Sequence, residues 1–296
     1  MTSTENFSER IEILRQAIKE ADHIIIGAGS GLSTAAGIDY AGDDFRREFK
    51  LWIERYGFTD LYTSSFYPFE TQEEYWAYWA KHIWFSRYRT GATELYKALC
   101  QRFPQAFVVT TNVDGQFELA GFPKERIFAT QGDSCFFQPA SGTPKTLIDN
   151  REWVFRVLPL IDYGSPASFT HPHNNTITHS PIRIPTEMIP RMPDNSPAAM
   201  NLRVDETFVE DFHWHQQARR YTDFVSEASE GRLLLLEFGI GYNTPGIIRL
   251  PFEQMAQKFP HTTLIRFNRD NPEPYIADLP RFTAFTEDIS AVLSHL

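Results

Sequence analysis

Cysteine is nearly absent from this chain. Its 296 residues include only Cys100 and Cys135, which cannot form a disulfide framework or a zinc site with four thiolates. The N-terminal residues lack the basic region and apolar core of a signal peptide, and no apolar run has the length of a transmembrane helix. We therefore expect a protein of the cytoplasm, without a membrane partner.

Basic residues are also scarce. The chain has 28 Lys and Arg against 38 Asp and Glu, a net charge of −10. Binding to a nucleic-acid backbone needs a basic surface, so this balance argues against a nucleic-acid partner. The hydrophobic content is ordinary and the aromatic fraction is high at 15%. That is enough for one substantial core, or for one core with a smaller module.

The most informative segment is the glycine-rich stretch at residues 24–38. An apolar, β-branched run leads into Gly27, Gly29 and Gly31, and small residues follow. A buried parallel strand delivers the backbone to a phosphate in this way, because glycine permits close approach and exposed N–H groups hold the anion. The spacing differs from the G-x-G-x-x-G pattern of dinucleotide-binding dehydrogenases, so a glycine-rich turn without a ligand is the alternative.

The rest of the chain alternates between predicted helices and strands. Strands are predicted at 23–26, 106–111, 126–130, 232–238 and 262–268, and helices at 7–21, 71–89, 93–103, 211–229, 246–258 and 286–295. This alternation predicts an α/β fold, a Rossmann-like parallel sheet with helices on both faces. We assign residues 1–132 and 211–296 to it, with a helical insertion at about 40–92. Residues 133–210 are rich in Pro, Asn, Ser and Thr and predict a small, loop-rich inserted module.

Polar or glycine-rich motifs follow four of the predicted strands. They occupy residues 27–33, 112–114, 131–133 and 239–244. Ligands of an open parallel sheet bind outside the carboxyl ends of its strands. We therefore expect the four motifs to form a single site.

These motifs resemble those of the sirtuins, in the same order along the chain. The sirtuin patterns are G-A-G-x-S-x-x-x-G-I, T-Q-N-[IV]-D and G-[TS]-S, and the matching segments here are 24–38, 110–121 and 238–245. The resemblance covers about two-thirds of the chain. It is closest to the macrodomain-linked sirtuins, class M, through the segments 110–114, 131–133, 201–203, 208–211 and 239–246.

The resemblance implies that the site binds NAD as a co-substrate and cleaves its bond to nicotinamide. The residues that it places around NAD are Gly27, Ala28, Gly29, Ser33, Asp114, Gly239, Gly241, Asn243 and Asn268. Asp114 would accept a hydrogen bond from the nicotinamide carboxamide. Capping of a helix is the alternative for Ser33 and Asp114, and loop geometry is the alternative for the two asparagines.

Two residues receive a catalytic role from the resemblance, Asn112 and Gln131. Asn112 would order the nicotinamide ribose and the acceptor side of its C1′ atom. Gln131 stands where lysine-deacylating sirtuins carry the histidine that acts as general base. A glutamine amide does not titrate near neutral pH and cannot take that proton. ADP-ribosyl transfer needs less, because positioning and electrostatics can carry much of its acceleration.

The zinc-binding cysteines of the sirtuins are missing here. Class M sequences often read C-P-x-C-G-x-x-M before N-L-R, whereas this chain has Met192 and Asn195 at the cysteine positions. His171, His173 and His179 could bind a metal, but they lack the usual ligand spacing. We expect no metal and no zinc, and a module at 133–210 that is held together by packing.

The function predicted from the sequence is NAD-dependent protein mono-ADP-ribosylation. The resemblance implies a lipoyl-carrier acceptor that is similar to the glycine-cleavage H protein, and a macrodomain hydrolase that removes the mark. One alternative is a lysine deacylase, against which Gln131 argues. Others are a catalytically weak NAD-sensing protein and a dehydrogenase, which shares the fold class.

Overall fold

The computed structural model describes residues 7–161, 182–242 and 245–296, which form two compact units. The first unit holds residues 7–38, 92–133 and 210–296 of this set, and the second holds 39–91 and 134–209. The helical segment that the sequence attached to the sheet therefore shares a unit with the inserted module. None of the described helices is long and apolar enough to span a membrane.

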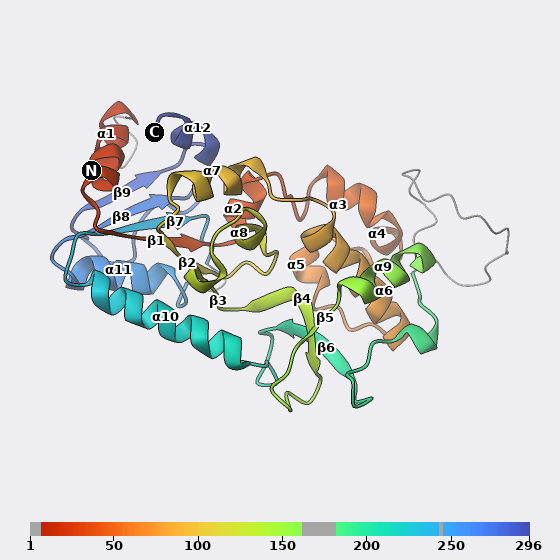
Figure 1. The fold of residues 1–296 in the computed structure, drawn as a ribbon. Coiled ribbons are helices and arrows are strands. Elements are labelled where there is room, and N and C mark those ends of the chain that lie inside the picture. Colours follow the sequence, from red (N-terminus) through yellow and green to blue (C-terminus); the bar gives the residue numbers. More distant parts are fainter. Residues whose placement is uncertain (1–6, 162–181, 243–244) are drawn as a thin grey trace. The chain divides into compact units, whose positions relative to one another are not determined.

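The first unit is built on a six-stranded parallel sheet (Figure 1). Its order is β3-β2-β1-β7-β8-β9. The strands are β1 (His23–Ala28), β2 (Phe107–Thr110), β3 (Ile127–Ala129), β7 (Leu233–Phe238), β8 (Thr262–Phe267) and β9 (Phe282–Phe285). From β1 the chain builds outward to β3 on one side, and from β7 to β9 on the other. The boundary between β1 and β7 is thus the switch point of the sheet.

Helices cover both faces of this sheet, as the sequence predicted (Figure 1). Ile26 of β1 packs toward one face, which carries α1 (Phe7–Glu20), α2 (Ser30–Ala35), α7 (Glu94–Arg102), α8 (Gln116–Leu119) and α12 (Ile289–Ser294). Ile25 packs toward the other face, under α10 (Phe212–Ala228) and α11 (Arg249–Lys258). A short 3-10 helix, η2 (Lys124–Arg126), precedes β3. Because both faces are covered, every residue of β7 is buried.

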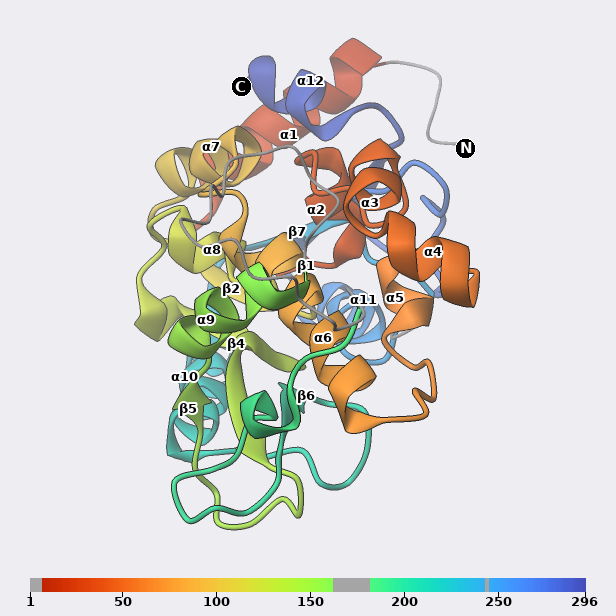
Figure 2. The same ribbon diagram turned by 90° about the vertical axis from the view of Figure 1, so that its right-hand side faces the viewer.

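The second unit combines a small sheet with helices. Its strand order is β5-β4-β6, with β5 (Ile148–Asp149), β4 (Gly132–Pro139) and β6 (Ala198–Leu202), and β4 and β5 are antiparallel. Its helices are α3 (Asp43–Glu48), α4 (Lys50–Tyr56), α5 (Leu61–Ser64), α6 (Gln72–Ile83), the π-helix η1 (Trp84–Tyr88), α9 (Arg151–Ile161) and the 3-10 helix η3 (Thr186–Met188). The segments α6 and α9 lie side by side (Figures 1 and 2).

Two elements contradict the sequence prediction. Residues 133–210 were expected to be mostly loop, yet they contain the eleven-residue helix α9 and most of the strand β4. The proline inside α9, Pro159, concealed its pattern, although Trp153, Val157 and Ile161 form a buried stripe. The edge strand β9 was missed because its four residues are too few to show a period.

Aromatic side chains make up much of the core of the second unit. Trp76 and Trp79 of α6 are 1% and 4% exposed, and Trp76 meets Phe137 and Trp153 edge-on at 5.3 and 5.7 Å between ring centroids. Such edge-to-face pairs add to the stability that comes from burial. The tryptophans of α6 therefore pack in the core of this unit.

Candidate functional site

The four motifs predicted to converge follow β1, β2, β3 and β7, which are neighbours in the sheet. Backbone hydrogen bonds tie the loops together where these strands end. The Gly29 N–H donates to the Phe238 carbonyl at 3.0 Å, and the Gly31 N–H donates to the Gly239 carbonyl at 3.0 Å. The structure thus assembles the carboxyl ends of β1 and β7 into one continuous surface.

Asn112, which follows β2, has its side-chain amide held in one orientation. Its Nδ2 atom donates to the Gly29 carbonyl at 2.9 Å and lies 3.1 Å from Ser33 Oγ and 3.2 Å from the Tyr96 hydroxyl. A backbone carbonyl can only accept, so the atom that faces Gly29 must be the nitrogen. The Asn112 Oδ1 atom then lies on the opposite side of the amide, without a partner among the described residues.

Both carboxylate oxygens of Asp114 accept hydrogen bonds from inside the protein. Its Oδ1 atom accepts the Gln116 N–H at the start of α8 at 3.0 Å, while Oδ2 accepts the Ser33 hydroxyl at 2.6 Å. The residue is only 2% exposed. Asp114 therefore fixes Ser33 and satisfies the N–H of the first residue of α8, while Gly115 is the N-cap of this helix.

Tyr96 of α7 is a member of this group that the sequence analysis missed. Its hydroxyl lies 2.9 Å from Ser33 Oγ and its side chain is fully buried. Burial raises the pKa of Tyr96 well above 10, and the nearby Asp114 charge raises it further. Tyr96 is therefore a neutral hydrogen-bonding group. No motif marks it, because a tyrosine on an amphipathic helix looks like any other core residue.

Gln131 lies in the turn between β3 and β4, where Gly132 has a φ of 92°. Its side chain is half-buried and has no hydrogen-bond partner within the described part of the chain. No hydrogen bond connects it to the group around Asn112. Gln131 therefore keeps its carboxamide available to a bound molecule.

The predicted glycines serve packing inside the protein. A Cβ on Gly27 would lie 2.6 Å from side-chain atoms of Ile248 and Phe252, so this glycine lets the sheet approach α11. A Cβ on Gly29 would lie 2.8 Å from the Gly239 carbonyl oxygen. Gly239 has a φ of 59° and no room for a Cβ beside Gly31. Ala28 is buried, and its carbonyl accepts the Thr111 N–H at 3.0 Å.

The remaining residues predicted to bind NAD differ in how many contacts they make within the protein. Gly241 has no atom within 4 Å of where a Cβ would stand, so its backbone is open to a ligand. Asn268 donates to the Ile240 carbonyl at 2.8 Å and accepts the Asn271 N–H at 2.9 Å. Its side chain thus joins the loops after β7 and β8, which supports the loop-geometry alternative. Asn243 lies outside the described residues.

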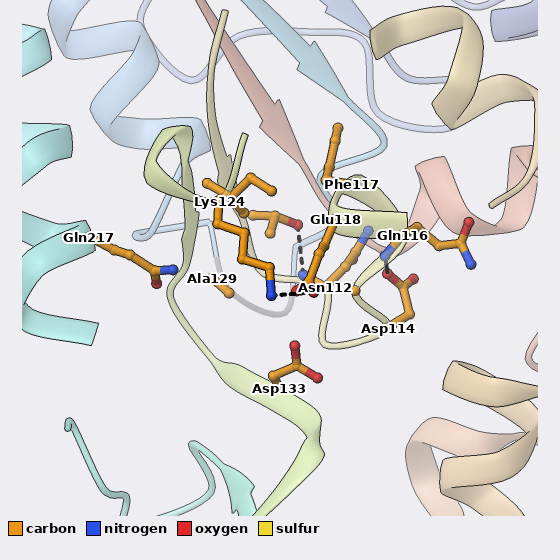
Figure 3. A pocket seen from close by; sticks show the side chains of 12 residues that line it. Asn112, Asp114, Gln116, Phe117, Glu118, Lys124, Ala129, Asp133 and Gln217 are labelled. Atoms are coloured by element: carbon orange, nitrogen blue, oxygen red, sulfur yellow. Dashed lines mark hydrogen bonds and ion pairs between the residues drawn. The ribbon is translucent and has the colours of Figure 1, made fainter. Parts of the chain in front are cut away.

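A cavity of about 80 Å³ lies beside Asn112 (Figure 3). It is formed between β2, β3 and α8, and Gln217 of α10 reaches its edge. Glu118 and Lys124 on its wall form an ion pair at 2.8 Å, and Asp133 lies across from them (Figure 3). The cavity is large enough for a few water molecules or one side chain, and it adjoins the amide of Asn112.

Met192 and Asn195, which stand at the cysteine positions of the sirtuin zinc site, lie in different environments from each other. Met192 is 4% exposed and belongs to the apolar core of the second unit, and Asn195 turns the chain with a φ of 67°. Among the described residues no group of three or more His, Cys, Asp or Glu could hold a metal ion. The three histidines at 171, 173 and 179 lie outside the described residues.

Solved sirtuin structures share this fold. The crystal structure of a Sir2 homologue in complex with NAD aligns over 99% of this chain and 93% of its own, with a TM-score of 0.55 and 13% sequence identity. The first unit, with its parallel sheet and glycine-lined strand ends, thus belongs to a protein with the sirtuin architecture.

Two curated proteins resemble the sequence itself, whereas no family model matches it. A protein ADP-ribosyltransferase of Staphylococcus aureus (strain Mu50) is 30% identical over 97% of this chain and 87% of its own length. A probable bifunctional ADP-ribose hydrolase/ADP-ribosyltransferase of Fusarium oxysporum f. sp. cubense is 26% identical over 84% of this chain and 40% of its own. This chain belongs to the family of the staphylococcal protein ADP-ribosyltransferase.

Proposed function

We propose that this chain is a mono-ADP-ribosyltransferase of the sirtuin type, class M, that uses NAD as co-substrate. The C1′–nitrogen bond to nicotinamide breaks and nicotinamide leaves with the electron pair. A nucleophilic atom of a protein side chain then bonds to C1′, and any proton that it carries passes to solvent. The family relationship to the staphylococcal enzyme supports this reaction class.

The orientation of Asn112 carries the proposal. Its Nδ2 atom is held by the Gly29 carbonyl, so its Oδ1 atom is presented away from the protein's own hydrogen bonds. Positive charge develops at C1′ as nicotinamide leaves, and a fixed amide oxygen stabilises such charge. Ser33 and Tyr96 hold the Asn112 amide in place, and Asp114 holds Ser33, so little reorganisation is needed during the reaction.

The surroundings of Asn112 support an NAD site at these strand ends. The open backbone at Gly241 leaves room beside the loop after β7, and Gln131 has an uncommitted amide for a ribose hydroxyl. The glycines at 27, 29 and 239 and Ala28 contribute by letting the loops meet, and Asn268 by joining them. We retain Asn243 as a further candidate from the resemblance.

Gln131 separates transfer from deacylation. A deacylase of this fold needs a base that takes the proton of a ribose hydroxyl, and a carboxamide cannot serve. Transfer asks Gln131 only to orient the ribose. We therefore expect no turnover of acyl-lysine peptides.

We further propose a lipoyl-carrier protein as acceptor and a macrodomain hydrolase as functional partner, in the cytoplasm. The lipoyl carrier rests on the resemblance to class M sirtuins alone. A hydrolase partner is supported by the Fusarium relative, whose name pairs an ADP-ribose hydrolase with the transferase.

The test is incubation of the purified protein with labelled NAD and candidate lipoylated carriers. We expect label on the carrier, with one nicotinamide released per label, and labelling that is slower by about 10²–10³-fold with Asn112→Ala. Acyl-lysine peptides should stay intact. Robust deacylation would contradict the role of Gln131, and NAD binding without nicotinamide release would favour the NAD-sensing alternative. Gln131→His tests whether the missing base alone prevents deacylation, and we expect little gain.

A further inference from the structure

A second cavity lies at the opposite edge of the parallel sheet, where β7, β8 and β9 begin. Its volume is about 150 Å³, and its walls come from the end of α1 and from residues at the start of these strands. The candidate site lies beyond the carboxyl ends of the sheet strands. The six residues of β7 place the two edges about 20 Å apart. The cavity is therefore separate from the candidate site.

Basic side chains gather at this cavity, although the chain as a whole has a net charge of −10. Arg232, His261 and Arg281 line it, and each stands one residue before a strand of the sheet. Because β7, β8 and β9 are neighbours, these three residues lie in a row along the edge. The acidic residue of the lining is Glu20, whose carboxylate accepts a hydrogen bond from the Gln16 amide. The lining thus carries more positive than negative charge.

Arg281 is held at the cavity by hydrogen bonds to β8. Its Nε atom donates to the Thr262 carbonyl at 2.9 Å, and its own carbonyl accepts the Leu264 N–H at 3.0 Å. Its φ is 47°, in the left-handed region that residues other than glycine seldom adopt. Strained backbone of this kind persists where the surrounding contacts enforce it, and it is frequent at ligand-binding sites. The tertiary structure, rather than a local preference, therefore places Arg281 here.

The two arginines of the cavity differ in how their charges are compensated. Arg232 donates to the Asp22 carboxylate from Nη2 at 2.8 Å and from Nε at 3.2 Å. Arg281 forms no ion pair with the residues that the structure describes, and its Nη2 atom donates to the Phe259 carbonyl at 3.4 Å. The Nη1 atom of each arginine donates no hydrogen bond within the described ranges. Each guanidinium is thus fixed on one side and keeps donors for a ligand on the other.

We propose that this cavity binds the oxyanion group of a small ligand, a phosphate or a carboxylate. Arg281 is the main donor because its charge is uncompensated, Arg232 is the second donor, and His261 lies beside them. Guanidinium groups suit this role because their planar array of N–H groups matches the oxygens of both anions. The inference is independent of the proposed function, since the cavity lies at the edge of the sheet away from Asn112.

The test is NMR of the full chain with isotope-labelled histidine, titrated with inorganic phosphate or with acetate. The pH is fixed, and chloride keeps the ionic strength constant. The ring signals of His261 report a ligand in the cavity, and His261→Gln identifies these signals. The variants are Arg281→Gln, Arg281→Lys and Arg281→Gly, of which the last suits the positive φ and guards against misfolding. Arg219→Gln, at an exposed arginine of α10, is the matched control.

We expect at least one of the two anions to shift the His261 signals saturably, and the anion that binds more tightly identifies the group that the cavity recognises. Arg281→Gln and Arg281→Gly should each weaken this binding roughly 10- to 100-fold, because hydrogen bonds from a charged donor are lost. Arg281→Lys should weaken it less, since it keeps the charge without the planar fork. Arg219→Gln should match the wild type.

Three outcomes would overturn the proposal. Equal affinity of the wild type and the folded Arg281→Gly variant would show that Arg281 does not bind the anion. A shift that does not saturate with either anion, or that chloride alone reproduces, would mean an adventitious ion only. Absence of any shift at His261 would show that neither anion enters the cavity. All three results would leave the proposed transferase activity untouched, because its site lies at the other edge of the sheet.

Discussion

The two units of this protein have cores of different composition. In the first unit, aliphatic residues of the strands pack against helices. Small and polar residues, such as Gly239 and Asn112, follow the carboxyl ends of these strands. The second unit fills its core with large aromatic rings around Trp76. The comparison teaches that hydrogen-bond geometry shapes the candidate site, whereas ring packing holds together the unit in which sirtuins usually carry zinc.

The largest effect is expected in the aromatic core. Trp76→Ala should lower the free energy of unfolding by about 3–5 kcal/mol, since it leaves a cavity between Phe137 and Trp153. Phe66→Ala removes a ring that is 57% exposed and should change stability by less than about 0.5 kcal/mol. Urea titration measures both. A small loss for Trp76→Ala would show that ring packing does not hold this unit.

The next effect concerns catalysis in the first unit. Asn112→Ala should reduce the rate of ADP-ribose transfer at saturating NAD by about 10²–10³-fold, because an oriented transition-state contact is removed. Single-turnover kinetics measure this rate, with Gln101→Ala as an exposed amide control on α7. Full activity of a folded Asn112→Ala variant would contradict the proposed role of Asn112 in stabilising charge at C1′.

Substitutions at two glycines should distinguish an effect on packing from an effect on NAD binding. A Cβ on Gly31 would lie 2.7 Å from Gly239 Cα, so Gly31→Ala should cost about 1–3 kcal/mol of stability. Gly241→Ala meets no atom within 4 Å and should leave the melting temperature unchanged while weakening NAD binding. Thermal melts with and without NAD compare the pair. Unchanged NAD binding in Gly241→Ala would show that NAD does not contact the backbone at Gly241.

The second unit should also lose stability in acid through His82. Burial lowers the pKa of His82 from 6.5 to about 3. Between these two pH values, His82 is protonated in the unfolded chain and neutral in the folded chain. Stability should fall by about 2 kcal/mol between pH 7 and pH 5 from this group alone. His82→Gln should reduce this loss of stability between pH 7 and pH 5. His213 is exposed, so His213→Gln should leave the loss unchanged. An equal slope in all three proteins would exclude His82 as the cause.

The smallest expected effect is that of chelation. We expect purified protein to contain no stoichiometric zinc and its melting temperature to stay constant with a chelator, since Met192 and Asn195 replace the thiolates. Elemental analysis and thermal melts check this. About one zinc per chain that survives mild chelation would mean that other residues bind the metal.

The sequence predicted the parallel sheet and the convergence of its motifs because both depend on local patterns. Apolar runs mark β1 and β7, and the polar residues after them must meet at one edge of a parallel sheet. The proline in α9 and the shortness of β9 concealed those elements. No pattern in the chain linked Tyr96 to Asn112, since the two residues meet only through the fold.

The sequence by itself determined the fold class, the edge of the sheet at which the candidate site was predicted, and the residue types at positions 112 and 131. Only the tertiary structure decided what those residues contact. It packed Gly29 against Gly239, fixed the Asn112 amide nitrogen on the Gly29 carbonyl, and placed Arg249 against the rings of Tyr242 and Tyr275. Periodicity is a property of neighbouring residues, whereas a hydrogen bond or a ring contact joins segments far apart in the chain, and folding alone brings these together.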